Sequence, residues 1–259
     1  MKKIILAIVI LLLLISLAFN VPNWFLSQEH RAEVTNKIDS IELDIKGVDT
    51  TIISKNQDYV EAELKGKGNV NLNKKGDTIE IEYHRQWFSL LNFGRKTKLT
   101  VTIPENYDRD LKVEVGSGNI DFKLSDDTVL QSLELEVGSG NIDIESLKAG
   151  NASLEVASGN IDMKHFTGEL DIDVASGNVS VQMDKLVGNI ETEVSSGRIV
   201  LDLPEDSDFT LNGEISSGTI KNRFPLKNEE SGNNRLRGTY GSGKYRIDLD
   251  VSSGTIEIK

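Results

Sequence analysis

The chain has 259 residues, of which 38% are hydrophobic, and its formal net charge is −12. It contains no cysteine, which excludes disulfides and thiol chemistry. Residues 1–100 carry 14 Lys and Arg against 12 Asp and Glu, a net of +2, whereas residues 101–259 carry 15 against 29, a net of −14. Nucleic acid is therefore excluded as a partner, because binding a phosphate backbone requires a basic surface.

The first 26 residues predict a membrane anchor. Lys2 and Lys3 precede an apolar run over residues 4–21, which as a helix is about 27 Å long. That length approaches the thickness of a bilayer hydrocarbon core, about 30 Å. The two lysines place the N-terminus in the cytoplasm, so this single-pass helix leaves the rest of the chain extracytoplasmic. The alternative is a signal peptide cleaved near residues 16–18, after which the domain is secreted.

Residues 27–37 are polar and predict a short stalk between the anchor and the domain. From residue 38 onward, apolar and polar residues alternate, as at Ile41, Leu43 and Ile45, which is typical of strands with one buried face. These first strands lack the Ser-Gly turns found later in the chain. We expect them to form the first, atypical units of the domain.

Residues 84–98 form an insert that contains aromatic and basic residues and no acid. One interpretation is a cap over the open end of the core, since the terminal units of a repeat fold must be covered. The other is a docking surface for a partner or for an anionic membrane, which suits a basic, aromatic segment. The candidate docking residues are Arg85, Trp87, Phe88, Phe93, Arg95, Lys96 and Lys98.

A Ser-Gly pair recurs from residue 117 onward, in stretches such as VGSGNID. The first six copies are separated by 22, 19, 18, 20 and 21 residues, and the last follows after 36. A period near 20 residues indicates a repeat architecture. We expect the glycines to supply the positive φ of tight turns. They are Gly118, Gly140, Gly159, Gly177, Gly197, Gly218 and Gly254.

Apolar residues alternate with polar ones on both sides of each turn, so each copy is expected to contain two short strands. An antiparallel meander and a β-solenoid, in which each copy is one coil, both fit this pattern. Recurring asparagines favour the solenoid, because stacked amides hydrogen-bond along a ladder. The predicted fold is therefore an all-β, β-solenoid domain over residues 38–259, with coils of about 20 residues. The ladder residues are Asn119, Asn141, Asn160 and Asn178.

A carboxylate stands four residues before each turn glycine, as at Glu155 and Asp173. In a solenoid these side chains stack about 4.8 Å apart, where two like charges repel by roughly 0.9 kcal/mol in water. We interpret the row as a solvated face that discourages aggregation. Calcium binding is the alternative, although the nonapeptide calcium-binding repeat is absent.

The sequence predicts no catalytic, cofactor-binding or metal-binding residue, and no cofactor. Gly238, Gly243 and Lys244 match most of the nucleotide P-loop pattern. However, Tyr245 stands where Ser or Thr should bind magnesium, and a strand pattern follows instead of a helix. The three histidines are far apart in the sequence and lack metal-ligand spacing.

Several stretches resemble a bacterial adhesin-type domain family. They are PENY leading into LKVEVGSGNIDF, LPEDSDFTLNGEISSGTI, and the terminal GSGKYRIDLDVSSGTIEI. The resemblance covers residues 38–259 and implies a β-solenoid-like fold without a defined catalytic motif. With the predicted anchor, the whole chain resembles LiaG-like membrane proteins of Gram-positive bacteria, which are encoded beside a regulatory system for cell-envelope stress. This resemblance implies an extracytoplasmic location and the envelope stress response as context.

The functional expectation is a non-catalytic extracytoplasmic protein of the cell envelope, with a binding or scaffolding role. Its expected partners are the membrane, through the anchor, and a cell-wall polymer, a lipid surface or another envelope-stress protein. The alternative is an extracellular carbohydrate-active enzyme, a class that also uses β-solenoids. An enzyme is expected to cluster ionisable residues in a groove that interrupts the ladders, whereas a scaffold is expected to have continuous ladders.

Overall fold

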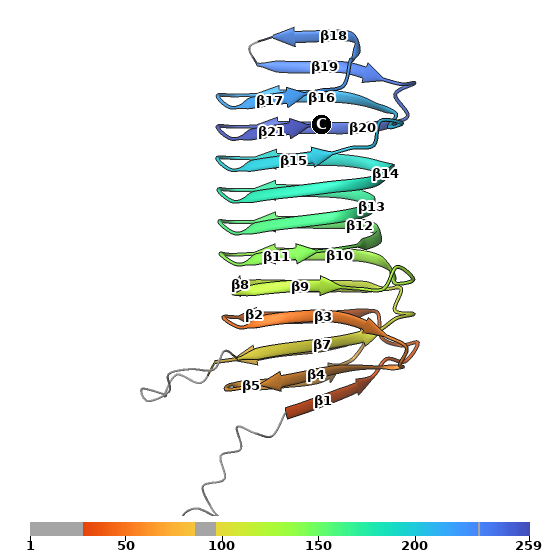
Figure 1. The fold of residues 1–259 in the computed structure, drawn as a ribbon, viewed down its shortest axis with the longest axis vertical. Helices are drawn as coiled ribbons and strands as arrows, with labels where there is room; N and C mark the ends of the chain where they lie inside the picture. Colours follow the sequence, from red (N-terminus) through yellow and green to blue (C-terminus); the bar gives the residue numbers. More distant parts are fainter. Residues whose placement is uncertain (1–27, 86–96, 233) are drawn as a thin grey trace, which may run out of the picture.

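The structure is a computed structural model that describes residues 28–85, 97–232 and 234–259. In this part of the chain every regular element is a β-strand, and the 21 strands form one sheet wound into a solenoid (Figure 1). No helix among these residues is long and apolar enough to cross a membrane. The predicted anchor at residues 1–26 lies outside the described residues.

The strands follow one another along the chain with short connections. The first ten are β1 (Gln28–Glu33), β2 (Ser40–Lys46), β3 (Asp49–Lys55), β4 (Tyr59–Lys65), β5 (Asn69–Lys75), β6 (Thr78–His84), β7 (Lys98–Pro104), β8 (Asp110–Ser117), β9 (Asn119–Lys123) and β10 (Val129–Val137). The others are β11 (Asn141–Ile144), β12 (Leu147–Val156), β13 (Asn160–Val174), β14 (Asn178–Val194), β15 (Arg198–Asp202), β16 (Phe209–Ile215), β17 (Thr219–Asn222), β18 (Lys227–Gly232), β19 (Arg235–Tyr240), β20 (Tyr245–Val251) and β21 (Thr255–Ile258).

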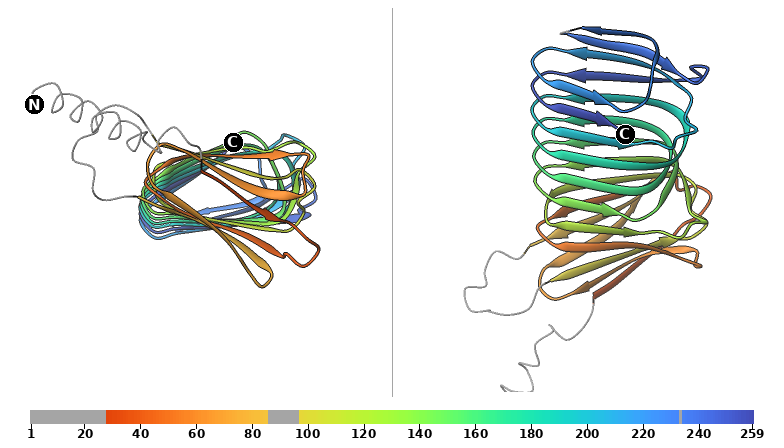
Figure 2. Two further views of the ribbon diagram at one scale, coloured as in Figure 1. Left: turned by 90° about the horizontal axis from the view of Figure 1, so that it is seen from below. Right: turned by 45° about the horizontal axis from the view of Figure 1, so that its top comes forward.

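The coils form two long faces that enclose the core (Figure 2). Face A consists, in spatial order, of β6, β2, β8, β10, β12, β13, β14, β20 and β16. Face B consists of β7, β3, β9, β11, β13, β14, β15, β21 and β17, and both series pair in parallel throughout. The long strands β13 and β14 continue around the bend and belong to both faces. Parallel pairing confirms the solenoid and excludes the meander.

Period-2 alternation along the strands of the two faces points every second side chain into the solenoid. On face B, equivalent positions of the coils from β9 to β21 form one inward row, and each member is at most 2% exposed. This row consists of Ile120, Ile142, Ile161, Val179, Ile199 and Ile256. The core is therefore a column of aliphatic side chains stacked at the spacing of the strands, about 4.8 Å.

The turn glycines are required mainly because neighbouring coils approach closely. Of the seven, Gly118 alone has a positive φ, +112°. A Cβ atom at Gly140 would lie 2.6 Å from the carbonyl oxygen of Gly118, and one at Gly254 would lie 2.5 Å from that of Gly197. Real Cβ atoms essentially never make such contacts. The expectation that positive φ explains the glycines is thus wrong for six of them, since the backbone of the adjacent turn occupies the space of their Cβ.

The first and last coils do not lie at the ends of the stack. β2 and β3 lie between the coil of β6 and β7 and the coil of β8 and β9. Likewise, β20 and β21 lie between the coil of β14 and β15 and the coil of β16 and β17. Both terminal coils are therefore held by neighbours on two sides. The sequence period contains no signal for this order.

Antiparallel strands close the N-terminal end of the solenoid. β4 pairs with β7, β1 pairs with β4, and β5 pairs with β6. The stalk predicted for residues 27–37 differs from the structure, because β1 occupies Gln28–Glu33 and belongs to the sheet. The physical reason is the backbone edge of β4, whose unpaired N–H and C=O groups gain partners from β1.

The C-terminal end is closed by β19, which pairs antiparallel with β16, and by β18, which pairs with β19. The rings of Phe209, Phe224 and Tyr240 pack together here, with centroid distances of 4.8 to 5.6 Å. All six residues of the outermost strand β18 are exposed. Its sequence KNEESG is polar, which discourages pairing with a further strand.

The P-loop-like sequence at residues 241–244 is a turn that binds a carboxylate of the same chain. Oδ1 of Asp208 accepts hydrogen bonds from the backbone N–H groups of Ser242, Gly243 and Lys244 at 2.7, 2.5 and 3.0 Å. Oδ2 accepts a bond from the Ser242 hydroxyl at 2.6 Å. That hydroxyl bond, together with the backbone bonds, lowers the pKa of Asp208 to about 2. The turn therefore fastens the start of β16 to the loop that leads into β20.

Replacing Asp208 should destabilise the domain in a pH-dependent way. Because the folded-state pKa of about 2 lies below the ordinary value of 3.8, the stabilisation is complete above the ordinary value and is lost as the pH falls through the folded value. Asp208→Ala should lower the Tm near neutral pH, and its difference from wild type should shrink toward about pH 2. Circular dichroism melts measure this. Asp206→Ala, at an exposed carboxylate, is the control; a pH-independent Tm difference for Asp208→Ala contradicts the assignment.

Candidate functional site

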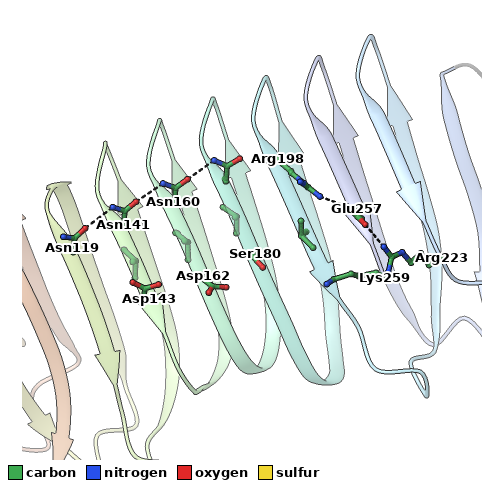
Figure 3. A pocket seen from close by; sticks show the side chains of 15 residues that line it. Asn119, Asn141, Asp143, Asn160, Asp162, Ser180, Arg198, Arg223, Glu257 and Lys259 are labelled. Carbon is green, nitrogen blue, oxygen red and sulfur yellow. Dashed lines mark hydrogen bonds and ion pairs between the residues drawn. The ribbon is translucent and has the colours of Figure 1, made fainter.

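The outward side of face B is hollowed into an open groove of about 740 Å³ (Figure 3). The groove crosses β9, β11, β13, β14, β15 and β21 and reaches Arg223, which follows β17, so equivalent side chains of successive coils line it in rows. Its polar lining residues are Asn119, Asn141, Asp143, Asn160, Asp162, Asn178, Ser180, Arg198, Arg223, Glu257 and Lys259.

The four asparagines named from the sequence form a hydrogen-bonded ladder along the groove. Nδ2 of Asn141 donates to Oδ1 of Asn119 at 2.9 Å. Asn160 donates in the same way to Asn141, and Asn178 to Asn160, each at 2.8 Å. Because all these bonds run in one direction, the amide dipoles add and each bond polarises the next.

Charged residues stand at both ends of this ladder, and sequence reasoning missed them. Asn119 donates its Nδ2 hydrogen to Oδ1 of Asp49 at 3.0 Å, so a carboxylate accepts the positive end of the amide chain. Arg198 occupies the register position next to Asn178, at the carbonyl end. Opposite charges thus face the two partial charges, as they do at the ends of helices. Asp49 lies 70 residues from Asn119, in a coil without the Ser-Gly signature.

At the other half of the groove, Arg198 and Arg223 share the carboxylate of Glu257. Arg198 donates to Oε2 at 2.7 Å and Arg223 donates to Oε1 at 3.2 Å. The hydrogen bond from Arg198 is the main cause of the lowered pKa of Glu257, whose side chain is 12% exposed. Lys259 pairs with Asp202 at 3.4 Å. These bonds hold the basic half of the groove in one arrangement.

The acidic half of the groove lies on β11 and β13. Asp143 has no ion pair in the described structure, and Asp162 lies 3.8 Å from Lys164. Ser180 separates this half from the arginines. The groove thus offers amides, carboxylates and guanidinium groups in two parallel rows with the spacing of the strands, which suits binding of a polar, elongated ligand.

The structure describes two of the seven predicted docking residues, and Lys98 continues the amide row of the groove, since it is in register with Asp49, which accepts the hydrogen bond of Asn119. Arg85 follows β6 and Lys98 begins β7, and both side chains are exposed. The other five candidates fall within residues 86–96, outside the described residues: Trp87, Phe88, Phe93, Arg95 and Lys96.

The acidic row lies on the outer side of face A and is longer than the turn pattern indicates. Asp44 and Glu82, from the atypical first coils, extend it by two positions. In the described part of the chain, no group of three or more acidic or histidine side chains is arranged to hold a metal ion. The row consists of Glu82, Asp44, Glu114, Glu136, Glu155, Asp173, Glu193, Asp250 and Glu214.

Lys112 compensates part of this negative charge. Its Nζ atom donates to Oε1 of Glu134 and to Oε1 of Glu136, both at 2.6 Å. The hydrogen bond to Glu134, followed by that to Glu136, raises the pKa of Lys112, and the bond from Lys112 lowers the pKa of Glu136. Asp173, in contrast, stands between Glu155 and Glu193 with no ion pair in the described structure.

Neutralising two members of the acidic row should have unequal effects on stability. Asp173→Asn removes repulsion from two neighbouring carboxylates and should raise the free energy of unfolding, by up to about 1 kcal/mol at low salt. Glu136→Gln also removes repulsion from two neighbours, Glu114 and Glu155, but it loses the ion pair with Lys112, worth roughly 0.2–1 kcal/mol, so its gain should be smaller by about that amount. Urea unfolding at low and high salt measures both changes. Equal effects of the two substitutions would contradict this account of face A.

Solved structures with a similar arrangement come from several bacteria, and each alignment covers 90% of this chain. A "putative adhesin" from Bacteroides fragilis is 14% identical with a TM-score of 0.47, over 97% of that chain. A "putative lipid binding protein" from Parabacteroides distasonis is 16% identical with a TM-score of 0.45, over 96%. A "putative cell adhesion protein" from Clostridium sporogenes is 14% identical with a TM-score of 0.36, over 99%.

Comparison with curated proteins finds no match. The family described as Toastrack DUF4097, in contrast, matches residues 38–259. That range contains all the coils of the solenoid, from β2 to β21. The chain therefore belongs to the Toastrack DUF4097 family.

Proposed function

We propose that this chain is a non-catalytic binding scaffold of the cell envelope, anchored by its N-terminal segment, whose solenoid binds a cell-wall polymer along the groove of face B. The observation that carries this proposal is the continuity of the ladders through the groove. From β9 to β17 the strands of face B stay in register, and no bulge or long loop interrupts them there.

The lining side chains support binding because they already hold one another in place. The ladder amides and the Arg198–Glu257–Arg223 cluster are tied by hydrogen bonds within the protein. A ligand therefore orders few side chains when it binds, which lowers the entropic cost of association. A linear polymer suits such a surface, because its successive units can meet equivalent groups on successive coils.

The same groove does not favour the alternative, a carbohydrate-active enzyme. Glycosidases use one carboxyl group whose pKa is raised by an apolar environment, opposite a second carboxylate. The side chain of Asp162 is 48% exposed and Asp143 is also exposed, so neither is desolvated. Glu257 has a lowered pKa because of Arg198, which is the reverse of what a general acid requires.

The proposed location rests on the N-terminal residues, and the link to envelope stress rests on the resemblance to LiaG-like proteins. A domain with 29 acidic and 15 basic residues after position 100 also suits a surface that stays soluble outside the membrane. The groove is long, open and periodic, and these properties fit a wall polymer better than they fit other envelope components.

Crosslinking in cells tests the binding site and the location together. A photoreactive residue in place of Ser180, in the groove, should crosslink the full-length protein to wall polymer in intact cells of a Gram-positive host. The same residue in place of Asp171, which is exposed like Ser180 but lies on face A, is the control and should capture little polymer. Capture of no envelope component from position 180 would contradict the scaffold, and equal capture from both positions would contradict the groove as its site.

A further inference from the structure

Segments far apart in the sequence meet at one corner of the N-terminal end. Gln28, which follows the apolar N-terminal segment, begins β1 and pairs with the end of β4. Lys98, where the insert returns to the sheet, pairs with Lys65, the last residue of β4. Asn69 pairs with His84, so the start of β5 lies beside the strand from which the insert departs.

Close contacts fix this corner. The backbone N–H of Lys67 donates to Oγ1 of Thr97 at 3.2 Å, and the hydroxyl of Tyr83 donates to the carbonyl oxygen of Lys67 at 3.0 Å. A Cβ atom at Gly66 would lie 2.9 Å from Cα of Thr97. The loop between β4 and β5 is therefore packed against both strands that border the insert.

The corner carries four cations, Lys65, Lys67, Arg85 and Lys98, which we call the basic corner. Lys65 and Lys98 stand directly opposite each other on adjacent antiparallel strands, a placement of like charges that costs stability. Glu63 pairs with Lys65 at 3.1 Å. Arg85 and Lys98 have no ion pair within the described structure. The neighbouring carboxylates are Glu63 and Asp49, which is in register with Lys98, so the four cations leave an excess of positive charge at this corner.

The length of chain outside the structure places a membrane near this corner. Six residues, 22–27, separate the apolar run from Gln28. Six residues span at most about 20 Å when fully extended. An anchored chain therefore holds the corner close to the bilayer, where Lys and Arg side chains are attracted to an anionic leaflet.

We propose that the basic corner lies against an anionic lipid surface and orients the solenoid, with its N-terminal end toward the bilayer and the groove of face B projecting away from it. This inference rests on the proposed anchoring of the chain. The like-charge pair of Lys65 and Lys98 is then a binding feature, because anionic headgroups relieve its repulsion.

The full-length chain in vesicles provides the test, and the absence of native cysteine allows single-cysteine labelling. Fluorophores at Asn69→Cys, beside the basic corner, and at Asn56→Cys, in the turn at the other end of β4, report distance from a headgroup-borne quencher. In phosphatidylcholine vesicles containing phosphatidylglycerol, the label at position 69 should be quenched several-fold more than the label at position 56. In pure phosphatidylcholine the difference should decrease.

Charge-reversal variants distinguish lipid binding by the basic corner from attachment through the anchor alone. Arg85→Glu with Lys98→Glu should abolish the effect of phosphatidylglycerol. Lys123→Glu with Lys185→Glu, both exposed and elsewhere on the solenoid, changes the net charge equally and should preserve the effect. If the label at position 69 is quenched equally in vesicles with and without phosphatidylglycerol, the proposed orientation is wrong. The same holds if both double variants lose the effect of phosphatidylglycerol to the same extent. Neither result would contradict the anchor. Failure of the wild-type chain to co-float with vesicles would overturn the anchor and the orientation together.

Discussion

The structure depends on the close approach of successive backbone turns, which is possible because their glycines lack a Cβ atom. Where the turn of Gly140 lies against that of Gly118, neighbouring coils stack in register from one face to the other. That register aligns every outward and inward position along the solenoid axis. The aliphatic core column, the asparagine ladder and the acidic row are all consequences of this one constraint.

Alignment has different energetic effects on different side chains. Identical amides gain from it, since each donates to the next in a directed chain that ends at Asp49. Identical carboxylates lose from it, because the register that benefits the core also brings like charges together. The molecule offsets part of that repulsion with Lys112 and with solvent exposure. The solenoid thus presents one face with internally bonded polar groups and one face that stays charged and hydrated.

The sequence alone predicts the features that recur in every coil, but it does not predict the contacts that occur only once in the fold. The period of the Ser-Gly pairs predicted the solenoid, and recurring asparagines identified the ladder positions. The sequence does not reveal why the glycines are needed, because positive φ is a local property whereas the clash of a Cβ atom depends on the neighbouring coil. The strand β1, the insertion of β20 and β21 between earlier coils, and the end of the ladder at Asp49 all depend on contacts between distant segments, which leave no periodic pattern.

The most direct test of this account is the stability of Gly159→Ala, compared with Ser158→Ala at the exposed neighbouring position. A Cβ atom at residue 159 would lie 2.6 Å from Cγ1 of Val137 and would also meet the carbonyl oxygen of Gly140. Because φ of Gly159 is not positive, the clash alone should decrease the free energy of unfolding, by about 1–3 kcal/mol in urea titrations. Ser158→Ala should have little effect. Equal stability of the two variants would contradict the claim that close stacking of the turns determines the fold.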